Sequence, residues 1–285
     1  MTASLLDGKS IAHQIQQNVA LKIKNHLNLG KRPPALAVVL ANNNPASFIY
    51  VQHKRQASAA VNIQSHFYHL AEDVSEQELI EIINKLNTDP LIDGILMQLP
   101  LPQHINTQLI IELINPDKDV DGFHPYNLGK LLLNQPNLRP CTPYGIMQLL
   151  QAYDLSVVGK NAVVIGASNI VGKPMALELL AAGATVTVCH KKTQHLECHV
   201  RAAEILIVAT GDRNCVSCEW LHSKHIILDV GIHRLPNKTI CGDINFKEAK
   251  QKVAWISPVP GGIGPMTVAT LLQNTMQAYE SSFLH

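Results

Sequence analysis

The sequence predicts an α/β protein built from two α/β units. Short apolar runs typical of buried parallel strands alternate with amphipathic helical patterns along the chain, as in layered α/β folds. A charged, turn-rich stretch over residues 116–125 interrupts this alternation and indicates a boundary close to it. The alternation then resumes, so we expect a first domain over 1–120, completed by a C-terminal helix over 266–285, and a second domain over 121–265.

Composition restricts the class of protein. The chain has 285 residues, 46% hydrophobic and 16% charged, and 23 basic against 22 acidic residues leave a net charge of +1. These values are those of a globular protein and favour neither nucleic acid nor a membrane surface as a partner. The N-terminus lacks the basic and apolar segments of a secretory leader, and no run of about 18 apolar residues occurs. We therefore expect a cytoplasmic protein.

Six cysteines are present, and Cys215 and Cys218 have C-x-x-C spacing. A zinc site would need a second cysteine pair or a histidine pair at matching spacing, and the sequence offers no obvious one. We expect reduced thiols and no metal.

The elements of the first unit follow from periodicity and capping. Apolar residues recur at steps of four from Ile11 to Leu27, which predicts a helix that ends at Gly30. Asn44-Pro45 opens a second helix that runs to Ala60. Ser75 with Glu78 forms a capping box that opens a third helix, and a fourth passes through 109–114. Strands are expected over 35–40, 63–70 and 94–99.

The second unit repeats the pattern after two helices expected over 127–133 and 144–153. A strand over 161–165, a helix over 173–180 and a strand over 184–189 form a complete βαβ unit. Further strands are expected over 205–208, 226–230 and 253–256. A last helix over 266–283 has an apolar stripe that includes Val268, Leu272 and Met276.

The loop over 166–172 is bounded by glycines and lies between a predicted buried strand and a predicted helix. Such a loop directs backbone N–H groups towards the helix N-terminus, where a phosphate binds in Rossmann-like dinucleotide-binding domains. The spacing here is G-x-S-x-x-x-G rather than G-x-G-x-x-G. An ordinary strand-to-helix turn is the alternative interpretation.

The next strand ends in Cys189-His190-Lys191-Lys192-Thr193. Sites for NAD usually place an acid here to bind the adenosine ribose hydroxyls, and this chain has none. Two lysines and a histidine suit an additional 2′-phosphate instead, which favours NADP. Solvated surface lysines are the competing interpretation.

Tyr50 and Lys54 are four residues apart on the second predicted helix and so share one face. An aromatic ring beside an amine could hold a flat ligand and move a proton next to it. The alternative is a surface lysine beside a half-buried tyrosine. His53 lies about 100° away around the helix, and we expect it to be structural.

Motifs along nearly the whole chain resemble the bifunctional methylenetetrahydrofolate dehydrogenase/methenyltetrahydrofolate cyclohydrolase family. They are Pro45-Ala46-Ser47 with Tyr50 and Lys54, the stretch 93–102 (DGILMQLPLP), the stretch 118–125 (KDVDGFHP), Pro140-Cys141-Thr142-Pro143, the loop 166–174, and the stretch 258–267 (PVPGGIGPMT). The resemblance implies an oxidoreductase and hydrolase of one-carbon metabolism that uses NADP and tetrahydrofolate substrates.

The resemblance also implies site residues. Lys54 would be the general acid/base of hydrolysis, Tyr50 would stack on the folate rings, Gln98 would help to set the protonation of the lysine, and Asp121 would bind the pterin N–H groups. Further folate contacts would come from Leu99, Pro100, Pro260, Gly261 and Gly262. The cofactor would contact Gly166, Ala167, Ser168, Ile170, His190, Lys191, Thr210, Gly211, Gly231, Ile232 and Thr267.

Two positions depart from the family pattern. Many members have arginine where this chain has Ala167, and the family often has serine at Lys191. Both positions face the 2′-phosphate region, so the origin of NADP preference is open and Lys191 is the candidate replacement. The family also implies a cleft between the domains and a homodimer formed through the cofactor domain.

Two other functions are compatible with the residues themselves. One is a different NADP-dependent dehydrogenase of the same two-domain shape, acting on a small hydroxy acid, and the other is a non-catalytic dinucleotide-binding protein. ATP-dependent formate ligation, which is sometimes fused to this family, is not expected because no G-x-x-x-x-G-K-[ST] loop is present.

Overall fold

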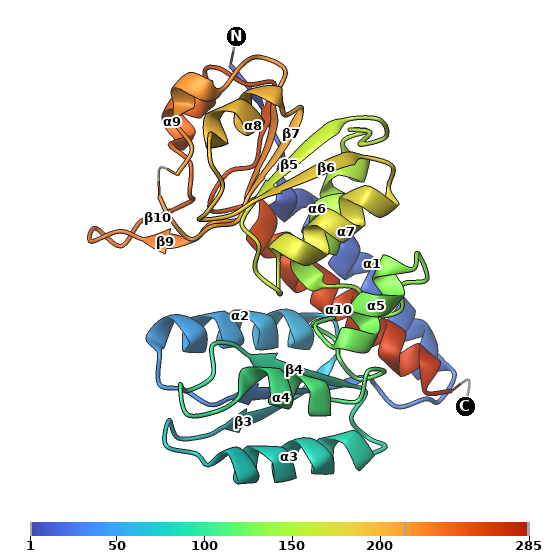
Figure 1. Cartoon of the computed structure of the whole chain (residues 1–285). Helices are drawn as coiled ribbons and strands as arrows, with labels where there is room; N and C mark the ends of the chain where they lie inside the picture. The colour runs from blue at the N-terminus through green and yellow to red at the C-terminus, as the bar shows by residue number, and fades with distance from the viewer. Residues whose placement is uncertain (1, 214, 284–285) are drawn as a thin grey trace. The chain divides into compact units, whose positions relative to one another are not determined.

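The computed structural model describes residues 2–213 and 215–283 and divides into two compact units (Figure 1). Unit 1 comprises Met1–Ala12 and Thr142–Thr267, and unit 2 comprises His13–Cys141 and Val268–His285. Residues 1, 214, 284 and 285, which fall within the predicted domain ranges, lie outside the described residues. The two α/β units confirm the predicted fold class.

The division falls after Cys141 rather than at residue 120, where the sequence suggested a boundary. The side-chain amide of Asn274 donates to the carbonyl oxygens of Val120 and Arg139, each at 2.8 Å. These bonds attach both ends of the intervening segment to the C-terminal helix, which belongs to unit 2. The functional roles of the predicted ranges stay predictions.

Unit 2 contains a three-stranded parallel sheet of order β3-β2-β4. Its strands are β2 (Ala35–Leu40), β3 (Gln64–His69) and β4 (Gly94–Gln98), and its shorter helices are α2 (Pro45–Ala60), α3 (Glu76–Thr88), α4 (Thr107–Leu113) and α5 (Pro125–Leu132). Asn44 and Ser75 cap α2 and α3 by accepting from the backbone N–H groups of Ala46 and Glu78, as their sequence positions indicated.

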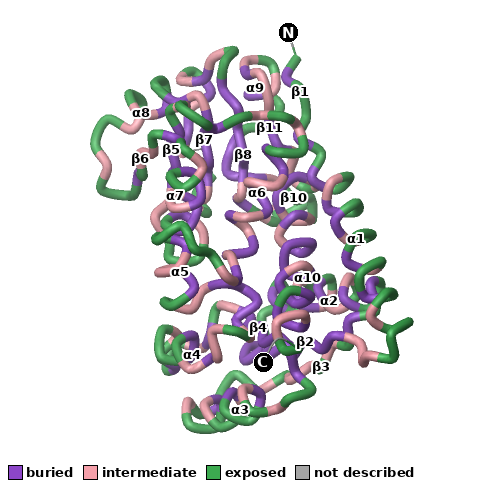
Figure 2. The backbone as a smooth tube through the Cα atoms, turned by 90° about the vertical axis from the view of Figure 1, so that its right-hand side faces the viewer, coloured by how far each residue is buried: buried purple, intermediate pink, exposed green. Residues whose placement is uncertain are grey.

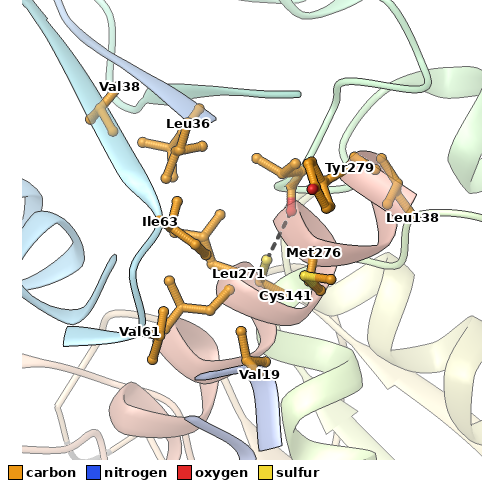
Figure 3. Packing of buried hydrophobic residues seen from close by; sticks show 14 of the residues in the cluster. Val19, Leu36, Val38, Val61, Ile63, Leu138, Cys141, Leu271, Met276 and Tyr279 are labelled. Carbon is orange, nitrogen blue, oxygen red and sulfur yellow. Dashed lines mark hydrogen bonds between the residues drawn. The ribbon is translucent and has the colours of Figure 1, made fainter. Parts of the chain in front are cut away.

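The central strand β2 is buried on both faces, which explains its continuous apolar run. One face packs against α3 and α4 in a cluster that includes Val39, Ile83 and Ile110. The other face packs against α1 (Gly8–Asn28), α2 and α10 (Ile263–Ser281). Figure 3 shows this second cluster, with Leu36 and Leu271 among its members.

Unit 1 contains a six-stranded parallel sheet of order β1-β11-β8-β7-β5-β6. Its strands are β1 (Ser4–Leu5), β5 (Asn161–Ile165), β6 (Thr185–Cys189), β7 (Ile205–Val208), β8 (Ile226–Asp229) and β11 (Trp255–Ile256). Strands β7 and β8 are buried along their whole length (Figure 2). Strand order reverses at β5, which lies between β6 and β7, and ligands of doubly wound sheets bind outside the carboxyl ends of the strands at such a point.

Helices α6 (Cys141–Ala152) and α7 (Gly172–Ala181) agree with the predicted elements. Other short elements of unit 1 were not predicted from the sequence: β1, α8 (Leu196–Ala202), the 3-10 helix η1 (Cys218–Trp220), α9 (Phe246–Ala249) and the hairpin β9 (His233–Arg234) with β10 (Ile240–Cys241). Each has seven residues or fewer, and the sequence shows no clear hydrophobic period in these segments. None of the helices in the described parts of the chain combines the length and apolar character needed to cross a membrane.

Candidate active site

Lys54 lies on the buried face of α2, together with Ser47, Val51 and Ser58. It is only 5% exposed, and its Nζ lies 4.8 Å from the centroid of the half-buried Tyr50 ring. The surface-lysine interpretation of this pair is therefore wrong. His53 is exposed, so the neighbouring imidazole does not share this environment.

Gln98, the last residue of β4, is hydrogen-bonded to the lysine. The Lys54 Nζ donates to Gln98 Oε1 at 3.3 Å, and Gln98 Nε2 donates to the carbonyl oxygen of Leu99 at 2.7 Å. The second bond fixes the orientation of the amide, because only the nitrogen can donate to a carbonyl. Gln98 therefore presents its oxygen, an acceptor, to the amine.

Asp121 supplies the charge next to this pair. Its side chain is buried, and burial raises its pKa from 3.8 to about 6, while the nearby Lys54 lowers it and Asp119 raises it. Burial also raises the pKa of Tyr50, and Asp121 and Cys141 add to that shift. Tyr50 is thus held as a neutral phenol beside a carboxylate that ionises above about pH 6.

Backbone and neutral groups hold the Asp121 loop in place. The Cys141 thiol donates to the carbonyl oxygen of Val120 at 3.2 Å (dashed line in Figure 3), and Asn274 Nδ2 donates to the same oxygen. Asp119 is also buried and lies two residues before Asp121. Its carboxylate accepts from the His124 N–H and from Asn127 Nδ2 at 2.8 and 2.9 Å. Sequence reasoning gave none of these residues a role; the only signal was that Asp119 and Cys141 fall inside the family motifs.

Leu99 and Pro100 follow β4 directly and are joined by a cis peptide bond. The side chain of Asn42, which follows β2, donates to the carbonyl oxygen of Pro100 at 2.8 Å. The carboxyl ends of two adjacent parallel strands thus place Gln98, Leu99 and Pro100 at one edge of the unit 2 sheet.

In unit 1, the predicted cofactor loop has the geometry of a close backbone turn. Gly166 has φ +121°, and a Cβ there would collide with the carbonyl oxygen of Ala209. A Cβ at Gly172 would collide with the carbonyl oxygen of Gly166. Both glycines are thus required by the way the loop packs, which favours the phosphate-loop interpretation over an ordinary turn.

The Ser168 Oγ accepts from the N–H groups of Val171 and Gly172 at 3.2 and 3.3 Å, which ties the loop to the first residue of α7. Ala167 is half-buried, whereas Ser168, Asn169 and Ile170 are exposed around the loop. The middle of the loop is therefore accessible to solvent, and the hydrogen bonds of Ser168 fix its conformation.

His190 and Lys191 follow β6, next to β5 in the sheet, and both are exposed. The His190 N–H donates to Thr193 Oγ1 at 2.9 Å, and the Lys192 N–H donates to His190 Nδ1 at 3.2 Å. These bonds close a tight turn that leaves the Lys191 side chain in solvent, where it could reach a phosphate.

The remaining predicted cofactor residues come from other strand ends and from α10. Thr210 and Gly211 follow β7, Gly231 and Ile232 follow β8, and Ile232 is 62% exposed. Thr267 lies in the first turns of α10, and its Oγ1 lies 2.9 Å from Thr142 Oγ1. The structure thus brings the β5, β6, β7 and β8 ends to one edge of the sheet, as parallel strands require.

Pro260, Gly261 and Gly262 belong to unit 1 and form the loop before α10, with a cis bond between Val259 and Pro260. The Gly262 N–H donates to the carbonyl oxygen of Pro258 at 2.8 Å, and the Lys9 N–H donates to that of Gly261 at 2.9 Å. The loop is therefore fixed against the start of α1.

The two C-x-x-C cysteines have separate surroundings. The Cys215 Sγ lies 3.3 Å from Thr210 Oγ1, and the Cys218 Sγ lies 3.8 Å from the carbonyl oxygen of Asn245. Both are free thiols, and burial raises the pKa of each.

Together these features define an α/β protein with a dinucleotide-type parallel sheet in one unit and a buried lysine, amide and carboxylate in the other. The model of the tetrahydrofolate dehydrogenase/cyclohydrolase catalytic domain matches residues 6–121, and that of the corresponding NAD(P)-binding domain matches residues 140–283. The chain belongs to the tetrahydrofolate dehydrogenase/cyclohydrolase family, which confirms the resemblance inferred from its motifs.

Individual relatives agree with this assignment. The chain is 58% identical over 278 residues to the bifunctional protein FolD of Legionella pneumophila, with 98% of each chain covered. A FolD crystal structure from Campylobacter jejuni has a TM-score of 0.95 at 47% identity and covers 98% of this chain and 99% of its own. The FolD of Trypanosoma brucei, solved with NADP and an inhibitor, has a TM-score of 0.96 at 33% identity, with full coverage of both chains.

Proposed function

We propose that this protein oxidises 5,10-methylenetetrahydrofolate to 5,10-methenyltetrahydrofolate with NADP+ and then hydrolyses the product to 10-formyltetrahydrofolate. Membership of the family supports both activities. The structural observation that carries the proposal is the buried amine of Lys54, which is bonded to Gln98 and lies within electrostatic reach of Asp121. Burying an amine and a carboxylate together costs both groups their hydration. Such a pair is therefore more typical of a functional site than of a purely structural one.

Binding of the folate is assigned to Asp121 and Tyr50. A reduced pterin offers several N–H donors, and the buried Asp121 carboxylate is a charged acceptor suited to them. The Tyr50 ring would support the flat pterin by stacking. Roles for Leu99, Pro100, Pro260, Gly261 and Gly262 in the same binding rest on the family motifs.

Hydrolysis is assigned to Lys54. Water must attack the C=N+ bond of the methenyl group, a base must remove a proton from that water, and an acid must then protonate the departing ring nitrogen. One amine can take both parts in turn. Gln98 holds the amine in place through its fixed oxygen.

The cofactor would supply the oxidation, because a bound dinucleotide would take up the hydride that leaves the folate methylene carbon. Gly166 to Ile170 would receive the pyrophosphate at the N-terminus of α7, and the turns after β7 and β8 would face the rest of the dinucleotide. The close-packed glycines and the accessible loop fit such a group. Oxidation requires positioning of the folate rather than a protein acid or base.

Purified protein incubated with 5,10-methylenetetrahydrofolate and NADP+ is expected to produce NADPH at a rate that depends on the folate. NADPH production without folate dependence, or none at all, would refute the proposal. A small hydroxy acid in place of the folate is expected to give no reduction, which sets aside the alternative dehydrogenase. Homodimer formation, which the family resemblance implies, and the cytoplasmic location expected from the sequence both belong to the proposal.

Cofactor preference tests Lys191. Replacing Lys191 by alanine is expected to raise KM for NADP+ about tenfold and to leave KM for NAD+ within about twofold, because one charge-assisted bond to the 2′-phosphate is lost. Lys247→Ala removes an exposed charge from the same unit and serves as the control. An unchanged ratio of the two KM values would show that Lys191 does not replace the missing arginine.

A further inference from the structure

Two buried aspartates are hydrogen-bonded to the turns that follow β7 and β8. Asp229 is the last residue of β8, and Asp243 follows β10; the two are 3% and 0% exposed. Asp229 Oδ1 accepts from the N–H groups of Gly231 and Asp243 at 3.1 and 2.9 Å, and its Oδ2 accepts from the Ile244 N–H at 3.0 Å. The side chain of Asp229 therefore fixes the backbone of Asp243.

The side chain of Asp243 in turn fixes the turn after β7. Its Oδ2 accepts from the N–H of Thr210 at 2.9 Å, from Thr210 Oγ1 at 2.9 Å and from the N–H of Gly211 at 3.1 Å. Its Oδ1 accepts from His233 Nε2 at 2.7 Å, which joins the start of the β9 hairpin to the same carboxylate. A single carboxylate thus holds segments that follow two different strands.

The adjacent glycines show how closely these groups approach one another. A Cβ on Gly231 would collide with the Asp243 carboxylate, and a Cβ on Gly242 would collide with that of Asp229. Gly231 is therefore required by the packing of an acid behind it, independently of any cofactor contact.

Burial of these acids has a cost that a purely structural turn would avoid. Burial raises the pKa of Asp229 to about 6 even though three backbone N–H groups bond to it. Apolar groups of similar shape often stabilise a protein interior at least as well as buried charges do. The charges are placed at the carboxyl edge of a parallel sheet, beside the reversal of strand order where a dinucleotide binds.

We propose that Asp243 is a positioning residue for the dinucleotide: it sets the conformation of the Thr210–Gly211 turn, and through it the affinity for the cofactor. This inference rests on the proposed function, because it takes the turns after β7 and β8 as part of the cofactor site. Asp229 supports it by holding the Asp243 backbone.

The test compares cofactor affinity with a reaction that uses no cofactor. Asp243→Ala is expected to raise the dissociation constant of NADP+, measured by calorimetry without folate, about tenfold or more, since it removes several charge-assisted bonds from the turn. Hydrolysis of 5,10-methenyltetrahydrofolate by the same variant is expected to stay within about twofold of wild type. Asp243→Asn keeps one oxygen for the Thr210 and Gly211 N–H groups and can donate to His233 in its other tautomer, so a smaller rise is expected.

Asp212→Ala is the matched control, because it removes an exposed acid from the same loop. An affinity for NADP+ within twofold of wild type in Asp243→Ala would overturn the inference. A parallel loss of hydrolysis and melting temperature in both Asp243 variants, with no recovery in Asp243→Asn, would also overturn it, because the role would then be structural. The calorimetric comparison decides the role of Asp243 even if the wild-type protein fails to oxidise the folate.

Discussion

Replacing Lys54 by methionine is expected to lower the rate of methenyltetrahydrofolate hydrolysis by about 10²- to 10⁴-fold, the usual contribution of a positioned acid or base. Methionine has a similar length and fills the same buried position on α2, so the loss would report the amine rather than a cavity. Oxidation of methylenetetrahydrofolate by NADP+ is expected to remain measurable, because hydride transfer uses no proton shuttle.

The pH of this assay matters because Lys54 lowers the pKa of Asp121. Removing the amine should raise that pKa above about 6, so both reactions are best compared near pH 8, where Asp121 remains ionised. His53→Met is the control, since it changes the exposed neighbour on the same helix. Equal losses of both activities in Lys54→Met would contradict an assignment to hydrolysis alone.

Replacing Asp121 by asparagine is expected to lower kcat/KM for the folate about 100-fold in both reactions. The amide loses the charge that strengthens two pterin N–H bonds, each worth roughly 1.5 kcal/mol or more. Steady-state kinetics of each reaction measure the effect, with Asp73→Asn, an exposed acid of the same unit, as the control. Loss in only one reaction would show that Asp121 acts in chemistry rather than in binding.

The pKa of Asp121 also predicts how substrate binding and stability depend on pH. In the wild type, KM for the folate should rise as the pH falls below about 6, because protonation removes the charged acceptor. Because the pKa is raised, ionisation of Asp121 is less favourable in the folded protein than in the unfolded one. The contribution of Asp121 to the free energy of unfolding is therefore fully present below pH 3.8 and is lost as the pH rises to about 6. Asp121→Asn should therefore be more stable than wild type at pH 8, by on the order of 2–3 kcal/mol. Urea unfolding at pH 4 and pH 8 measures this difference.

Much of the fold followed from local patterns. Strands β2, β5 and β7 have the predicted bounds because each is a short run of mainly apolar residues, buried throughout except for Asn161 at the start of β5. The Ser75 cap and the Asn44-Pro45 start were readable because capping uses nearby residues. Strand β1 escaped prediction because two residues carry no period, and its pairing with β11 joins opposite ends of the chain.

The candidate site was readable only in part. Tyr50 and Lys54 share a helix face, so their pairing followed from spacing, yet the burial of Lys54 depends on elements distant in sequence. Asn274 lies 154 residues from Val120, whose carbonyl oxygen it binds, and no local pattern predicts that contact. Asp243 was missed for the same reason, because its role appears only when the ends of β7 and β8 are placed side by side.

If one protein carries out both the oxidation and the hydrolysis, the fate of the folate product will show it. Wild-type protein with 5,10-methylenetetrahydrofolate and NADP+ is sampled over time, and the folates are separated by chromatography. We predict that 10-formyltetrahydrofolate accumulates in step with NADPH, and that the Lys54→Met variant instead accumulates the methenyl compound. Accumulation of the methenyl compound by the wild type, in proportion to NADPH, would show that this protein does not hydrolyse the product of its oxidation.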